Sequence, residues 1–154
     1  MMNLRRRELW DKGLKNADQR SNVHGILGQK KFQHRLDSDG DVIFQYGGMS
    51  YVLMAEETDP RFVRILLPAF WKVDSDIERS RALEAINEIS LKYKVTKMGI
   101  VSDRVVAMAE FWMDIPKDLY KDFERILKCL SVTVKQFYKR MIYGMEVEKA
   151  KGDG

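Results

Sequence analysis

The spacing of apolar residues changes near residue 31 to a period of two, and this change constrains the fold more than any other feature of the chain. Apolar and polar side chains that alternate in this way indicate β-strands with one face toward a core. Four segments with strand character follow one another: KFQHRL at 31–36, VIFQY at 42–46, MSYVLMAE at 49–56 and RFVRILLP at 61–68. Gly47–Gly48 joins the second segment to the third, and two glycines suit a tight hairpin because its central residues take positive φ. We therefore predict an antiparallel meander that ends at Pro68.

A helix is predicted after the meander. Ser75 and Glu78 have the spacing of a capping box, in which two side chains satisfy free amides at a helix start. The segment RALEAINEISLKYK at 81–94 continues this helix, with Asn87 at the margin of its apolar stripe and Glu88 in solvent. The stripe consists of Ala82, Ile86, Ile89 and Tyr93, widened by Leu83.

Two further strands and a long helix complete the pattern. TKMGIV at 96–101 and RVVAMAEFWM at 104–113 have strand character, and we expect a loop longer than two residues around Ser102–Asp103 because Ser–Asp suits a tight turn poorly. The last helix begins near Pro116, a residue favoured in the first helical turn. Its continuous apolar face consists of Leu119, Phe123, Ile126, Leu127, Leu130, Val134, Phe137 and Met141.

The order of these elements predicts an α+β domain, in which helices pack on a twisted antiparallel sheet in the order α-β-β-β-β-α-β-β-α. A doubly wound nucleotide-binding fold is disfavoured because strands and helices do not alternate and no Gly-rich phosphate turn occurs. Residues 1–20 are expected to form a charged arm or a short helix, and 21–145 one domain that begins with a short helix at 21–30. Residues 146–154 are expected to form a polar disordered tail.

The composition indicates a soluble protein of the cytoplasm. The 154 residues are 45% hydrophobic and 32% charged, as in ordinary globular domains. No apolar run approaches the ~20 residues that a membrane span needs, and the basic start MMNLRRRELW lacks the apolar core of a signal peptide. Cys129 is the single cysteine, which excludes an internal disulfide and fits a reducing compartment.

No residue pattern in the sequence indicates catalysis, a cofactor or a metal. The run Asp37-Ser38-Asp39-Gly40-Asp41 resembles a calcium loop, but its glycine stands at the fourth position instead of the sixth, so we interpret the run as a hairpin turn. His24 and His34 lie on different predicted elements from Cys129, which sits at the edge of a buried helix face. We therefore expect no catalytic, cofactor-binding or metal-binding residues.

Partner binding is indicated by strands that are apolar on both faces. An antiparallel sheet with one face in water alternates more regularly than segments 49–56, 62–67 and 104–113 do. One face would be covered by the helices, and the other by the remaining helix, a second subunit or a client peptide. Methionines supply adaptable apolar surface, and Glu110 shares a strand face with Trp112. The candidate partner-binding residues are Met49, Met54, Met108, Glu110 and Trp112.

Several stretches of the chain resemble the YbjN family of bacterial proteins, which have the fold of type III secretion chaperones. These stretches are DGDVIFQYGG at 39–48, SYVLMAEETDPRF at 50–62, ILLPAFW at 65–71, ALEAINEI at 82–89, KYKVTKM at 92–98, AEFW at 109–112 and QFYKRM at 136–141. The resemblance implies a secretion-chaperone-like fold and a role in regulating sensory transduction, and it implies no catalytic residues. The chaperone relatives are small dimers that bind unfolded segments on apolar strand surfaces.

The sequence therefore predicts a non-enzymatic, chaperone-like or regulatory protein-binding module that acts as a homodimer. The alternative is a transcriptional or signalling regulator that contacts nucleic acid, which the net charge of +4 leaves open. The basic groups that would make this contact are Arg5–Arg7, Lys30–Lys31, Lys92, Lys94, Lys97, Lys135, Lys139 and Arg140.

Overall fold

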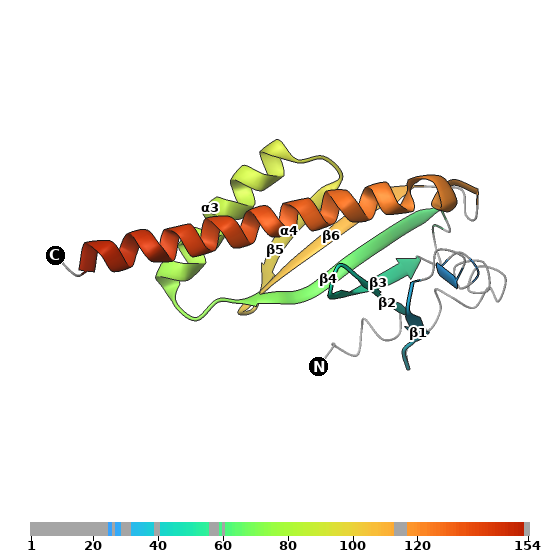
Figure 1. Ribbon diagram of the computed structural model, residues 1–154, viewed down its shortest axis with the longest axis horizontal. Coiled ribbons are helices and arrows are strands. Elements are labelled where there is room, and N and C mark those ends of the chain that lie inside the picture. The colour runs from blue at the N-terminus through green and yellow to red at the C-terminus, as the bar shows by residue number, and fades with distance from the viewer. Residues whose placement is uncertain are drawn as a thin grey trace.

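A six-stranded antiparallel sheet and two helices form the part of the chain that the computed structural model describes: residues 25, 27–28, 32–38, 41–55, 59, 61–112 and 117–152. The elements are β1 (His34–Leu36), β2 (Val42–Tyr46), β3 (Met49–Ala55), β4 (Phe62–Lys72), α3 (Asp76–Lys92), β5 (Thr96–Val101), β6 (Arg104–Trp112) and α4 (Lys117–Gly152). The strands are hydrogen-bonded in the order β1-β2-β3-β4-β6-β5. The predicted α+β class is confirmed (Figure 1).

Two-residue turns close the predicted hairpins at residues 47–48 and 102–103. Gly47 and Gly48 have φ of +56° and +80° and connect β2 to β3, as their sequence predicts. The turn at Ser102–Asp103 is also only two residues long, because Val101 pairs with Arg104. Ser102 takes a left-handed φ of 58° there, so the expectation of a longer loop is wrong. Val105 of β6 must face the core, where it is fully buried, and this fixes the pairing of β5 with β6. The pairing outweighs the poor preference of Ser–Asp for a two-residue turn.

β4 continues through Pro68, where the sequence predicted its end. Leu67 pairs with Ala107 and Trp71 with Val105 of β6, so three residues of β4 lie opposite Val106 in a bulge. Pro68 is exposed within this bulge, where its missing amide hydrogen is not needed for the ladder. The prediction failed because proline was interpreted as a strand end, although a bulge also tolerates it.

Both helices pack on one face of the sheet. In Figure 1, α4 runs along the sheet and α3 lies beside it. The predicted stripe of α4 is confirmed for its described residues, since six side chains have no exposed area: Phe123, Leu127, Leu130, Val134, Phe137 and Met141. On α3, the buried residues are Ala82, Ala85, Ile86 and Ile89, and they share one apolar cluster with Phe137 and Val105. Leu83 is half exposed and does not widen the buried stripe as predicted.

α4 also extends farther than the sequence predicted. It ends at Gly152, so residues 146–152 are helical where we expected a disordered tail. The segment EVEKAK contains strong helix formers and no proline, and a polar composition on its own does not end a helix. The predicted arm at 1–20 and most of the predicted helix at 21–30 lie outside the described residues. Within that helix, Gly25, Leu27 and Gly28 are helical, and Leu27 is fully buried.

The start of α3 is fixed to the end of β4 by the predicted capping residues. The Glu78 amide donates to Ser75 Oγ at 3.1 Å. In return, Glu78 Oε2 accepts from the amide of Asp74 at 2.8 Å, and its Oε1 accepts from Trp71 Nε1 at 2.9 Å. The Glu78 carboxylate therefore caps α3 and also holds the end of β4 and the residues that connect it to the helix.

Candidate partner-binding surface

The sheet face turned away from α3 and α4, which we call the open face, carries a continuous row of side chains from every strand. The cross-strand register aligns Arg35, Ile43, Val52, Leu66, Met108 and Lys97. We call these six residues the cross-strand row. Its four central members are apolar and half-buried, whereas the cations at both ends are exposed. Neither described helix lies on this face, so the row is a candidate contact surface for a partner.

An ion cluster borders the cross-strand row. Arg64 Nε donates to Glu110 Oε1 at 2.7 Å, and Lys97 Nζ donates to Glu110 Oε2. Burial raises the pKa of the Glu110 carboxyl, but hydrogen bonds from Lys97 and Arg64 outweigh this effect and hold the pKa below its ordinary value of 4.5. Glu110 is therefore ionised at neutral pH, and the cluster has two cations for one carboxylate.

Two aromatic side chains lie beyond the ion cluster on the same face. Phe62 pairs across the strands with Trp112, and their rings make an edge contact with centroids 5.5 Å apart. Trp112 Nε1 donates to Asp59 Oδ2 at 2.8 Å, while 68% of the residue remains exposed. A large ring that is held in place yet exposed is typical of residues at protein interfaces.

The structure brings four of the five predicted partner-binding residues to the open face. Met108 belongs to the cross-strand row, Glu110 lies in the next row, and Trp112 follows at the end of β6. Met54 lies beside Arg64 in that next row, but it is buried, with only 8% of the residue exposed. Met49 is the exception, because it lies with Tyr46 on the helix-covered face and packs against the core. It therefore does not share a surface with the others.

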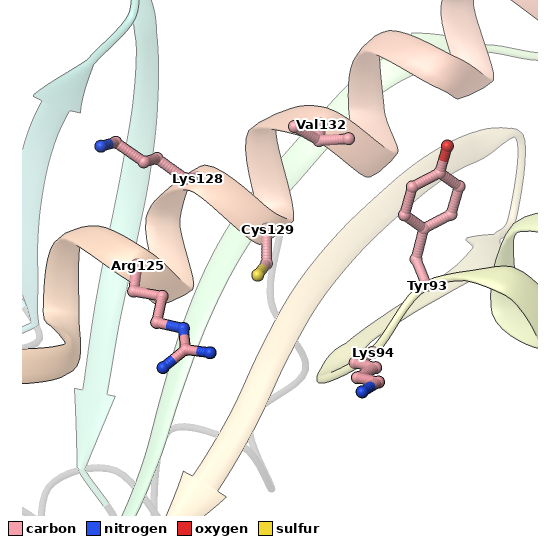
Figure 2. A pocket seen from close by; sticks show the side chains of 6 residues that line it. All are labelled: Tyr93, Lys94, Arg125, Lys128, Cys129 and Val132. Carbon is pink, nitrogen blue, oxygen red and sulfur yellow. The ribbon is translucent and has the colours of Figure 1, made fainter.

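A separate pocket of about 240 Å³ lies between α4 and the loop from α3 to β5 (Figure 2). It is lined by Tyr93, Lys94, Arg125, Lys128, Cys129 and Val132. Ligand sites usually enclose about 300–1,000 Å³ and place several polar groups around the reacting atom. Neither a histidine nor a carboxylate is among these six lining residues, so the lining supplies Cys129 with no general base of these types.

The remaining candidates for chemistry also lie apart from one another. His34 Nδ1 is 2.9 Å from the carbonyl oxygen of Phe32 on the β1 side of the sheet, and His24 lies outside the described residues. The Asp41 amide donates to Asp37 Oδ1 at 2.9 Å, which closes the chain between β1 and β2. Within the described parts of the chain, no three His, Cys, Asp or Glu side chains are grouped so that they could hold a metal ion.

A match to a protein-family model identifies the family of this chain. Residues 17–131 match the family described as T3SS (YopN, CesT) and YbjN peptide-binding chaperone 1. The chain belongs to this family. The resemblance to YbjN proteins that the sequence suggested is thereby confirmed, over most of the domain predicted at 21–145.

A solved structure supports the fold of this YbjN-type chaperone-family member. It is the crystal structure of an uncharacterized protein from Methanothermobacter thermautotrophicus, with a TM-score of 0.54 and 8% sequence identity. The match covers 80% of this chain and 99% of that protein. No curated protein matches the chain. Among the described helices, none is long and apolar enough to cross a membrane.

Of the six residues of the cross-strand row, the sequence predicted only Met108 as a partner-binding residue in this member of the family. The sequence patterns place Arg35, Ile43, Val52 and Leu66 in strands but not on a shared face. Lys97 enters the sequence analysis only as one of the basic groups that could contact nucleic acid. The missing information was the pairing register between strands, because a shift by one residue moves each side chain to the other face. Alternation within β6 did correctly place Glu110 and Trp112 on one face.

Proposed function

We propose that this chain is a non-enzymatic protein-binding module that holds an apolar peptide segment of a partner protein on the open face. The observation that carries the proposal is the run of four half-buried apolar side chains in the cross-strand row, on a face that neither described helix occupies. Apolar surface of this kind on a soluble domain is characteristic of interaction sites. The family description, which names peptide-binding chaperones, supports the same proposal.

The proposed site of action is the cytoplasm, and the proposed assembly is a homodimer. The single cysteine is a free thiol, which fits a reducing compartment. Support for a dimer comes from Ile142 and Tyr143 on α4, which are 49% and 68% exposed. Light scattering of the wild type should give twice the chain mass of 18.0 kDa. Tyr143→Lys should weaken the dimer and shift the measured mass toward that of a single chain. A monomer at all concentrations would remove the dimer from the proposal and leave peptide binding intact.

Peptide binding is tested with labelled 12-residue peptides of apolar sequence, measured by fluorescence anisotropy. Leu66→Gln places an amide at the centre of the cross-strand row, and we expect it to weaken binding at least tenfold. Leu91→Gln is the matched control, because Leu91 is 83% exposed on α3, away from the open face. Equal affinity of both variants and the wild type would overturn the proposed site, provided that circular dichroism shows both variants folded.

Nucleic-acid binding by a regulator is the alternative function. On α4, Lys135, Lys139 and Arg140 are exposed, but Arg140 is paired with Glu88 of α3. A labelled DNA duplex is titrated at 50 and 200 mM salt, because phosphate contacts weaken steeply over this range. Strong binding at low salt that disappears at high salt would favour the alternative, and no binding at either salt would exclude it.

A further inference from the structure

We propose that the partner segment is an extended peptide that crosses the strands along the cross-strand row and has an acidic side chain at each end of a short apolar stretch. This inference rests on the proposed function and adds the direction and the charge pattern of the occupant. The row itself has this pattern in complementary form, since Arg35 and Lys97 enclose four apolar residues.

The length of the row sets the spacing of the two acidic residues. Six strands are joined by five intervals of about 4.8 Å, so the row spans ~24 Å. An extended peptide advances by about 3.3 Å per residue. The two acidic residues should therefore be six to eight positions apart, with apolar side chains at alternate positions between them directed toward the sheet.

The twist of the sheet favours an extended peptide over a helix. Neighbouring strands rotate by roughly 20–25°, so the side-chain direction turns by about 100° or more between β1 and β5. A straight helix could contact only part of such a surface, whereas an extended chain can follow it. Strand addition is the other common mode of peptide binding to a sheet. Of the two edge strands, β1 has only three residues and β5 has six, and a strand added to either edge would not contact the cross-strand row along its length.

The charges of the open face favour an acidic occupant. The cross-strand row ends in two cations, Arg35 and Lys97, and none of its six residues is a carboxylate. In the next row, Arg64 forms an ion pair with Glu110. The Lys97 side chain is 67% exposed, and exposed ion pairs contribute little stability. Lys97 can therefore exchange Glu110 for a carboxylate of the partner, while Arg64 remains as the hydrogen-bonding partner of Glu110.

The test uses three peptides with one apolar centre and with Glu, Ser or Lys at positions 1 and 7. For the wild type, the Glu peptide should bind at least tenfold more tightly than the Lys peptide at 50 mM salt, and this ratio should fall at 500 mM salt. A second Glu peptide with the acids only three positions apart should bind several-fold more weakly. Glu110→Gln releases both cations and should strengthen binding of the Glu peptide.

Charge reversal identifies the end of the row that each acid contacts. Arg35→Glu should reduce affinity for the Glu peptide at least fivefold, and a peptide with Lys at the matching end should restore it. Lys128→Glu, which changes an exposed residue of α4 on the other side of the molecule, is the matched control and should have no effect. Binding of all three peptides with equal affinity would overturn the charge pattern but leave the proposed function standing. Failure of every peptide to bind would reject the proposed function itself.

Discussion

The two faces of β6 differ completely although their residues alternate along one strand. Val105, Ala107 and Ala109 have no exposed area and lie on the face that α3 and α4 cover. Val106 and Met108, between them, are half-buried on the open face. The covered face uses alanine where helices approach closely, whereas the open face has larger side chains that no described helix contacts. One strand therefore contributes small side chains to the core and larger ones to the proposed binding surface on its other side.

This contrast leads us to expect that residues important for stability and residues of the proposed binding surface lie on opposite faces of the sheet. A fully buried aromatic cluster between β2, β3 and α4 includes Phe44, Tyr51 and Phe123, with ring centroids 5.5–5.6 Å apart. The open face instead keeps apolar side chains partly in water, where they add less to folding. Substitutions on the covered face should therefore reduce stability, and substitutions on the open face should chiefly reduce binding.

Phe123→Ala should have the largest effect on stability. The ring is fully buried, so its removal loses buried area and leaves a cavity, and we expect a loss of about 3–5 kcal/mol in the free energy of unfolding. Urea denaturation measures this loss. Leu66→Ala on the open face is the comparison and should cost roughly half as much or less, because Leu66 already contacts water in the folded state. Equal losses would mean that the open face is part of the core.

Glu110→Gln should have the next largest effect on stability and should make it depend on pH. The folded pKa of Glu110 lies below its unfolded value, so the stabilisation is complete above about pH 5 and is lost as the pH falls through the folded pKa. At pH 7 the variant should lose about 1–2 kcal/mol, since hydrogen bonds to a charged group are weakened. Thermal denaturation from pH 2 to 7 should show the two proteins converge in acid. A constant difference at all pH values would contradict the assigned role of the charge.

The sequence predicted what depends on local patterns. The Ser75–Glu78 cap, the Gly47–Gly48 turn and the stripe of α4 each follow from a spacing within a few residues. The cross-strand row could not be predicted in the same way, because Leu66 and Met108 are brought together by pairing between strands far apart in the chain. The bulge at Pro68 belongs to the same class, since it appears only when β6 is paired with β4.

Ala69→Gly should slightly stabilise the protein, in contrast to the same change on the covered face. Ala69 has a φ of 47° in the bulge of β4, a left-handed conformation that glycine adopts without the Cβ clash. We expect a gain of about 0.5–1 kcal/mol, measured by urea denaturation. Ala107→Gly changes a fully buried residue in regular strand conformation and should instead destabilise the protein by a similar or larger amount. A loss of stability in Ala69→Gly would show that the Cβ makes a favourable contact in the bulge.

Asn87→Ala should have the smallest effect, and it extends the comparison from the sheet to α3. The sequence left two outcomes open: a cost of about 1–3 kcal/mol if the amide satisfied a buried backbone group, or nearly none if it were exposed. Asn87 is exposed, next to the buried Ile86. We therefore expect a change within about 0.5 kcal/mol, on the stabilising side because alanine is the better helix former. Ile86→Val, one residue away, should cost about 0.5–1.5 kcal/mol by urea denaturation. A larger loss for Asn87→Ala than for Ile86→Val would mean that Asn87 belongs to the buried face of α3 and not to its exposed face.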